Sequence, residues 1–383
     1  MKGLKGVRAY VRGVGIVETD IGFEDGKITH LGKNEQETIE DILTVPSEAL
    51  VLPGFVDEHI HGAGGSDAMD ATPAALETIS TTVAKEGTTA FLATTMTQSR
   101  ENIAAALENV RICMEKGLGG ARTVGVHLEG PYIEMDFRGA QNAEYVAMPT
   151  VESMEEYRKV SGDNIRIVTF SPHESDAVDF VHYLKENGIT AAVGHSGVLY
   201  DRLEEAADVG LRSVTHTYNA QSGVHHRKFG VAGAALLDDR LYAELICDTI
   251  HVCPPAMKLL VKCKPRNRLV LVTDAIRAKG LPEGESELGG QKVFVKNGEA
   301  RLADGTLAGS VLHMNHAVRN LIEKVGVSFA DAVDAASYNP ACNIGLDGEI
   351  GSIAVGKRAD FTVVNSEFEV LATVVGGKVV YQK

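Results

Sequence analysis

Six side chains that can ligate a metal ion or move a proton stand at the ends of short apolar runs of the sequence. Two of them, His59 and His61, are separated by one residue, so they share a face if this segment is a strand. Imidazole and carboxylate groups without cysteine are the ligands expected for divalent Zn, Fe, Mn, Ni or Co. The six residues are His59, His61, Glu129, His195, His216 and Asp274.

The composition of this set predicts a hydrolytic centre with one or two divalent metal ions. A carboxylate such as Glu129 can bridge two ions, each completed by a pair of histidines. A cation lowers the pKa of a bound water toward about 7, which supplies hydroxide at neutral pH. The remaining carboxylate, Asp274, would take up the proton and return it to a leaving group. The histidine pairs are His59 with His61 and His195 with His216.

These residues can meet only if the strands that carry them are neighbours with one orientation. Short apolar runs alternate with stretches of helical spacing, which favours an α/β fold with a (β/α)8 barrel over a doubly wound sheet. The C-terminal strand ends of such a barrel converge at one mouth. The eight runs cover residues 55–60, 89–93, 123–128, 165–170, 190–193, 213–215, 242–247 and 269–273. The helical stretches cover residues 74–85, 101–116, 176–186, 200–208, 255–263 and 312–325.

Both ends of the chain have the pattern of short strands with tight turns, and neither end is long enough to form a core alone. Together they predict one small β-sandwich made from both termini. A long insertion over 276–311 follows the eighth strand and is expected to contain a hairpin over 293–302. The predicted domains are a small β domain from 1–52 and 346–383 and a catalytic barrel from 53–345.

The composition limits the partners of the protein. The 383 residues carry a formal net charge of −15, so neither nucleic acid nor an anionic membrane surface is an expected partner. No apolar run approaches the roughly 18–20 residues of a membrane span. The five cysteines form no CxxC pair, which is typical of free thiols in a cytoplasmic protein. An anionic substrate would need local cations, and Arg227 in a short basic cluster suits phosphate.

The sequence resembles the amidohydrolase superfamily and, more narrowly, the family of N-acetylglucosamine-6-phosphate deacetylases. The tail over 351–360 is similar to the return of that superfamily into its small β domain. The strings that resemble the deacetylases span most of the chain in the expected order. They are His127-Leu128-Glu129-Gly130-Pro131-Tyr132, Gly194-His195-Ser196, Thr215-His216-Thr217-Tyr218-Asn219-Ala220, Thr273-Asp274-Ala275 and Leu307-Ala308-Gly309-Ser310.

The resemblance implies a reaction and a role for individual residues. The reaction is metal-dependent hydrolysis of the acetamide of N-acetylglucosamine 6-phosphate, a phosphorylated amino sugar, to glucosamine 6-phosphate and acetate. Glu129, His195 and His216 match the principal metal ligands, and Asp274 matches the acid/base. Arg227 matches a phosphate-binding arginine that reaches across a dimer interface, so a homodimer is expected. Further substrate contacts are implied for Ala140, Gln141, Asn219, Ala220, His251, Leu307, Ala308 and Gly309.

Three positions depart from the patterns of related enzymes. The fourth strand ends without the carbamylated lysine of many dinuclear amidohydrolases, so Glu129 is expected to bridge instead. Gln141 stands where single-metal members usually carry a histidine that polarises the amide. We infer that a second metal at His59 and His61 takes over that task. Thr249 stands where the resemblance leads us to expect glycine, before His251.

Three alternatives stay open at this point. The same reaction on N-acetylgalactosamine 6-phosphate differs at one hydroxyl group, and no residue that would recognise that group is identifiable. A cyclic-amide hydrolase of the dihydroorotase type is disfavoured by the missing lysine. A barrel without catalytic activity that serves as an interaction scaffold is disfavoured by the complete ligand set.

Overall fold

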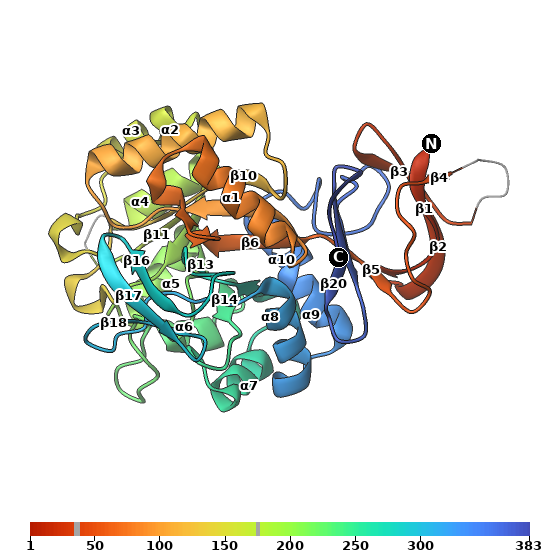
Figure 1. The fold of residues 1–383 in the computed structure, drawn as a ribbon. Helices are drawn as coiled ribbons and strands as arrows, with labels where there is room; N and C mark the ends of the chain where they lie inside the picture. Colours follow the sequence, from red (N-terminus) through yellow and green to blue (C-terminus); the bar gives the residue numbers. More distant parts are fainter. Residues whose placement is uncertain (34–38, 174–176) are drawn as a thin grey trace.

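A barrel of eight parallel strands forms the larger part of the protein (Figure 1). The structure is a computed structural model that describes residues 1–33, 39–173 and 177–383. The order of the strands around the barrel follows the sequence, and each strand overlaps one of the predicted apolar runs, which confirms the predicted fold class. The strands are β6 (Phe55–Ile60), β9 (Thr88–Thr94), β10 (Arg122–Glu129), β11 (Ile165–Phe170), β12 (Thr190–Val193), β13 (Leu211–Val214), β14 (Tyr242–Ile246) and β15 (Leu269–Val272).

The first and last strands of the barrel come together beyond their C-terminal ends. Ile60 forms a parallel bridge with Ala275, and the backbone N–H of Asp274 donates to the carbonyl of His59 at 2.8 Å. Because β6 carries His59 and β15 leads into Asp274, this junction brings the two ends of the predicted site side by side.

Helices cover the outside of the barrel and bury one apolar stripe each. In α2 the Ser99 side chain caps the N-terminus, and Ile103, Leu107 and Val110 are buried at a spacing of three to four residues. The six predicted helical stretches are present, although residue 176 lies outside the described residues and 312–325 is α8 followed by a π-helical turn (Leu321–Val325). The helices are α1 (Pro73–Ala84), α2 (Arg100–Lys116), α3 (Val151–Ser161), α4 (Ala177–Glu186), α5 (Tyr200–Val209), α6 (Val231–Leu237), α7 (Pro254–Cys263), α8 (Met314–Asn320), α9 (Phe329–Ala336) and α10 (Tyr338–Asn343).

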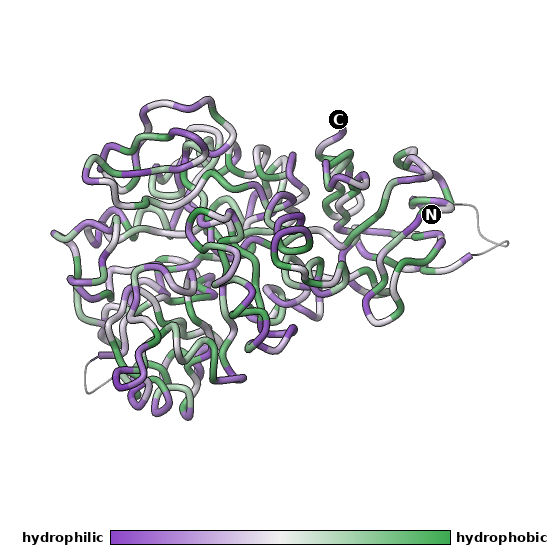
Figure 2. Tube along the Cα trace, turned by 90° about the horizontal axis from the view of Figure 1, so that it is seen from below, coloured by the Kyte–Doolittle hydropathy of each residue, from purple (hydrophilic) through white to green (hydrophobic). Residues whose placement is uncertain are grey.

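The two ends of the chain form a smaller β structure at one side of the barrel, and both termini lie in it (Figures 1 and 2). It is one continuous sheet in the order β21-β20-β19-β5-β1-β2-β3, with β4 paired to β1. The sheet folds over on itself. The ring centroids of Phe23 in β2 and Phe361 in β19 lie 6.1 Å apart, although two strands separate β2 from β19 in the sheet. Its strands are β1 (Lys2–Val11), β2 (Gly15–Glu24), β3 (Lys27–Leu31), β4 (Glu40–Asp41), β5 (Leu50–Pro53), β19 (Phe361–Val364), β20 (Val370–Val375) and β21 (Lys378–Gln382).

The insertion after β15 forms a three-stranded antiparallel sheet rather than the predicted hairpin alone. The strands are β16 (Gly284–Leu288), β17 (Gln291–Lys296) and β18 (Glu299–Leu302), and β17 pairs with both of the others. A pair of very short strands, β7 (Gly62–Ala63) and β8 (Ser66–Asp67), follows β6. Among the residues that the structure describes, no helix combines the length and apolar character required to cross a membrane.

Candidate active site

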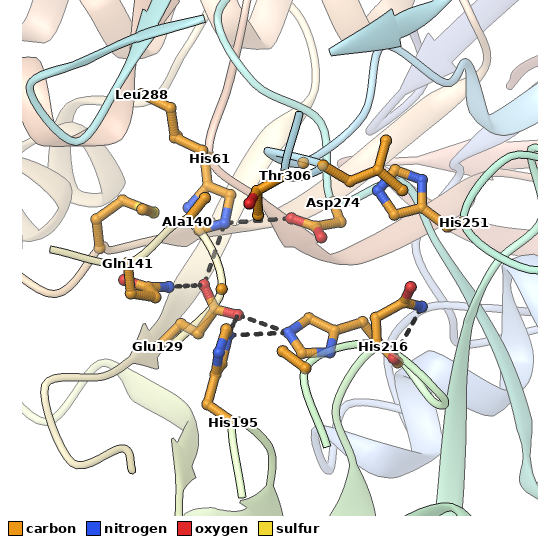
Figure 3. A pocket seen from close by; sticks show the side chains of 16 residues that line it. His61, Glu129, Ala140, Gln141, His195, His216, His251, Asp274, Leu288 and Thr306 are labelled. Atoms are coloured by element: carbon orange, nitrogen blue, oxygen red, sulfur yellow. Dashed lines mark hydrogen bonds and ion pairs between the residues drawn. The ribbon is translucent and has the colours of Figure 1, made fainter. Parts of the chain in front are cut away.

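The strand ends open into a pocket of about 210 Å³, and most of the predicted site residues line it (Figure 3). Met96, Leu288 and Thr306 also line the pocket and were not predicted. The predicted residues in the lining are His61, Glu129, Ala140, Gln141, His195, His216, Asn219, Ala220, His251, Asp274, Leu307 and Gly309.

Three predicted residues lie outside the pocket lining. His59 is fully buried behind it, and Ala308 is buried in an apolar cluster that includes Leu288. Arg227 lies in the exposed loop between β13 and α6, where its guanidinium contacts His226. The fold of one chain therefore does not bring Arg227 into the pocket, and its predicted role depends on a second chain.

Glu129 lies at the centre of the site, with a different set of nitrogens at each carboxylate oxygen. Its Oε1 lies 3.4 Å from His59 Nε2, 3.2 Å from His195 Nε2 and 3.1 Å from His216 Nε2. Its Oε2 lies 3.2 Å from His61 Nε2. This arrangement suits a carboxylate shared between two groups of histidines.

The hydrogen bonds behind His195 and His59 imply that, when these rings are neutral, each turns a lone pair toward Glu129. His195 Nδ1 lies 2.9 Å from the Phe137 carbonyl, which can only accept, so in the neutral ring Nε2 carries a lone pair toward Glu129. His59 Nδ1 lies 3.0 Å from Glu244 Oε2, and the Nε2 of His59 has no hydrogen-bond partner. A buried imidazole lone pair that faces a buried carboxylate is unfavourable unless a cation lies between them. Imidazole and carboxylate groups are suitable ligands for a divalent metal ion.

Asp274 approaches the same ring nitrogen of His61 as Glu129 does (Figure 3). Its Oδ1 is 3.3 Å from His61 Nε2 and 3.5 Å from His59 Nε2, so it could complete an ion site with these two histidines. The other ligand group in the pocket consists of Glu129, His195 and His216. The structure thus brings together all six residues predicted from the strand ends, and it places Asp274 closer to the first pair than the sequence prediction assumed.

The histidines keep the two carboxylates ionised despite their burial. Burial raises the pKa of Asp274, but the positive charge of His59 and the hydrogen bond with His61 outweigh it and lower the pKa to about 2. Burial likewise raises the pKa of Glu129, whereas His59, His195 and His216 hold it well below its usual range. Both groups are therefore carboxylates near neutral pH and can ligate a cation or accept a proton.

Glu244 is a buried residue of the site that the sequence prediction missed. Its Oε2 accepts hydrogen bonds from His59 Nδ1 at 3.0 Å and from the backbone N–H of His216 at 2.9 Å. Such a carboxylate fixes the tautomer and the ring orientation of a histidine ligand. The signal was present, since Glu244 is the one charged residue in the apolar run 242–247 that forms β14.

Gln141 holds the orientation of Glu129. Its Nε2 donates to Glu129 Oε2 at 2.8 Å, and its Oε1 accepts from the backbone N–H of Thr97 at 2.7 Å. Both ends of the amide are thus engaged, so Gln141 is buried as a brace between the loop after β9 and the central carboxylate.

The predicted substrate-binding residues approach the pocket from several loops. Asn219 and Ala220 lie just after His216, and Ala220 has a left-handed backbone with φ of 48°. His251 is held by Asp248, whose Oδ2 lies 2.6 Å from His251 Nδ1. Thr249, which stands where glycine was expected, does adopt a positive φ of 69°. The loop can therefore form with threonine, although at the cost of backbone strain.

The fold and the site agree with the comparison to protein families. The model of the amidohydrolase family matches residues 50–380 of the chain. The chain belongs to the amidohydrolase family. Its fourth barrel strand indeed carries no lysine at its end, so the carboxylate in the shared position between the histidine groups is Glu129 from β10.

Individual relatives within this family are similar to almost the whole chain. An N-acetylglucosamine-6-phosphate deacetylase from Bacillus subtilis is 40% identical over 365 residues, which cover 94% of this chain and 92% of that protein. An N-acetylgalactosamine-6-phosphate deacetylase from Escherichia coli O157:H7 is 36% identical over 355 residues, 92% of this chain and 94% of that one. The crystal structure of N-acetylglucosamine-6-phosphate deacetylase from Thermotoga maritima superimposes with a TM-score of 0.90, 33% identity and full coverage of both chains.

Proposed function

We propose that this amidohydrolase removes the acetyl group of N-acetylglucosamine 6-phosphate and releases glucosamine 6-phosphate and acetate. The observation that carries the proposal is the pocket in which the ionised carboxylate of Asp274 faces a buried cluster of histidines around Glu129. The similarity over nearly the full chain to deacetylases of this substrate supports it.

The residues that would hold metal follow from the two ligand groups. Glu129, His195 and His216 would hold one divalent ion, and His59 and His61 would hold a second with Glu129 between them. A bound divalent ion polarises the amide carbonyl and makes a water molecule acidic enough to supply hydroxide near neutral pH. The donor set admits Zn, Fe, Mn, Ni or Co, and we propose one or two ions per chain.

Asp274 would move the proton during the reaction. As a carboxylate it accepts the proton of the attacking water, and as the acid thus formed it protonates the departing amine. Its position on the pocket wall, with Oδ1 3.3 Å from His61 Nε2, supports this role.

The remaining residues would bind the sugar phosphate. Asn219 and Ala220 would receive the phosphate in the turn after β13, together with Arg227 from a second subunit of a homodimer. The other proposed contacts of the sugar and its acetamide are His251, Ala140, Gln141, Leu307, Ala308 and Gly309.

We propose that the enzyme is cytoplasmic. The five free cysteines, which form no disulfide, are consistent with that compartment.

The galacto epimer is the second candidate substrate, because a relative of almost equal similarity carries that name. The test measures acetate release from both hexosamine phosphates and from both unphosphorylated sugars, with metal analysis of the same preparation. We expect the gluco phosphate to give the highest kcat/KM. Equal or higher values for the galacto phosphate would reverse the assignment, and no release from any of the four would refute deacetylation.

The role of Asp274 has its own test, because its oxygen also lies within reach of an ion at His59 and His61. Asp274→Asn keeps the size of the side chain and an oxygen ligand but cannot accept a proton. We expect metal content and substrate affinity to survive while kcat falls by a factor of about 10²–10⁴. Loss of metal together with activity would make Asp274 chiefly a ligand, and a normal kcat would place the base elsewhere.

A further inference from the structure

One wall of the pocket is apolar and comes partly from outside the barrel. Met96 follows β9, and Leu288 is the last residue of β16 in the inserted sheet. Both side chains line the pocket, yet only 1% of Met96 and 2% of Leu288 is exposed. Behind them the inserted sheet contributes Val293, Val295 and Ala300 to the same apolar cluster. Packed apolar side chains therefore support the wall from behind.

The turn that follows Leu288 is tied to the barrel on two sides. Gln98 Nε2 donates to the carbonyl of Gly289 at 3.0 Å, and Gln291 Nε2 donates to the carbonyl of Ala140 at 2.6 Å. Gly289 has a φ of 58°, and a Cβ at this position would lie 3.3 Å from Met96 Cε. The wall is thus fixed against both the loop after β9 and the loop that carries Gln141.

The position of the wall relative to the reacting groups suggests what it contacts. Figure 3 shows Leu288 beside His61, on the opposite side of the pocket from His251. In the proposed reaction, the amide carbonyl would lie at an ion held by Glu129 and the histidines, and the amide nitrogen would lie within reach of Asp274. With the sugar bound toward His251, as proposed above, the acyl chain would extend to the opposite side of the pocket, where Leu288 lies.

We propose that Met96 and Leu288 form the acyl pocket and restrict the enzyme to short, apolar N-acyl groups. This inference rests on the proposed deacetylation. The amide of Gln141, which also lines the pocket, is already engaged, since its oxygen accepts from the Thr97 N–H and its nitrogen donates to Glu129. A hydroxyl or carboxylate on the acyl chain would be buried against the apolar side chains of Met96 and Leu288, which is unfavourable.

The experiment compares kcat/KM for the N-acetyl, N-propionyl, N-butyryl and N-glycolyl forms of glucosamine 6-phosphate with the metal-replete enzyme. An apolar pocket usually discriminates by a factor of about 10–200 per methylene group. We therefore expect the wild type to lose at least about tenfold from acetyl to propionyl and to disfavour the glycolyl form. Leu288→Ala should raise the propionyl-to-acetyl ratio about tenfold or more. Leu288→Val, which removes one methylene, should raise it by less and covers the case in which the alanine variant does not fold.

The control is Val293→Ala, which opens a cavity in the same apolar cluster without touching the pocket. Its propionyl-to-acetyl ratio should equal that of the wild type. The proposed acyl pocket would be refuted if the Leu288 variants kept the propionyl-to-acetyl ratio of the wild type. It would also be refuted if Val293→Ala raised this ratio as much as the Leu288 variants do. The comparison requires that the wild type releases acetate at a measurable rate. If the wild type releases no acetate, the proposed function itself is refuted.

Discussion

Replacing Glu244 by glutamine tests whether the carboxylate behind the ligands orients them. Its Oε2 accepts two hydrogen bonds, from His59 Nδ1 and from the backbone of His216, and the side chain is fully buried. In Glu244→Gln, an amide oxygen in the position of Oε2 would still accept both hydrogen bonds but would lack the negative charge that polarises His59. An amide nitrogen in that position would instead face two N–H donors. Both orientations weaken the hold on His59.

The expected size of the effect follows from similar partners of metal ligands. Removing such a partner usually lowers metal affinity or activity by about 10–100-fold, equivalent to about 1.4–2.7 kcal/mol. Because the affected side chain is His59, the ion that it shares with His61 should bind more weakly, and the ion at His195 and His216 should change less. Calorimetric titration of metal-free protein with Zn²⁺ or Mn²⁺ measures both affinities.

Glu58→Gln is the matched control for this experiment. Glu58 is also fully buried and adjoins His59 in the sequence, but the side-chain hydrogen bond of its Oε1 comes from Asn343, at 2.8 Å, and not from a histidine of the site. Its metal affinity should stay near that of the wild type. If Glu244→Gln binds both ions with unchanged affinity, or if Glu58→Gln weakens them equally, Glu244 does not have the orienting role argued from these hydrogen bonds.

Three further predictions concern the metal and the phosphate. Changing both His59 and His61 to alanine should lower the metal content from about two ions per chain toward one, measured by elemental analysis, and an unchanged content would refute a second site. Removing metal with a chelator should lower the melting temperature, because an ion at 100 times its Kd contributes about 2.7 kcal/mol, and Zn²⁺ should restore it. Arg227→Ala should raise KM for the phosphorylated sugar about ten- to hundredfold and leave the unphosphorylated sugar unchanged. Activity restored by mixing it with Asp274→Asn would show that the arginine acts across the dimer interface.

The sequence was informative where a polar residue ends an apolar run. The predicted barrel strands and the six residues at their ends were found together, because parallel strands in a barrel must present their C-terminal ends at one mouth. Helices in the irregular intervals 130–164 and 217–241 were missed. Of these, α6 covers only seven residues, and the equally unpredicted α9 and α10 cover eight and six, so their periodic signal was short.

The sequence was uninformative where a residue acts through its surroundings. Met96 and Leu288 are ordinary core residues by type, and only the inserted sheet places them in the pocket wall. Strands at the two ends were predicted, but local patterns do not specify strand partners. One continuous sheet that folds over on itself therefore could not be distinguished from two separate layers.

Backbone strain at the ligand positions links the fold to the chemistry. His195, His216 and Asp274 have positive φ values of 48°, 30° and 47°, and left-handed backbone costs about 1–2 kcal/mol for a residue with a side chain. Glycine would remove this cost but also the ligand. Hydrogen bonds hold the strained positions, since the His195 carbonyl accepts from Glu134 and the Asp274 N–H donates to His59.

The three strained residues together cost roughly 3–6 kcal/mol, which is a large part of the 5–15 kcal/mol that typically separates folded from unfolded protein. A sharp left-handed turn right after a strand aims the side chain across the barrel mouth instead of continuing the alternation of the strand. When the His195 ring is neutral, its lone pair faces the Glu129 carboxylate, and an ion held between them would offset this repulsion. The surrounding barrel therefore stabilises a set of ligands whose own geometry is unfavourable, and a bound ion would return part of that free energy.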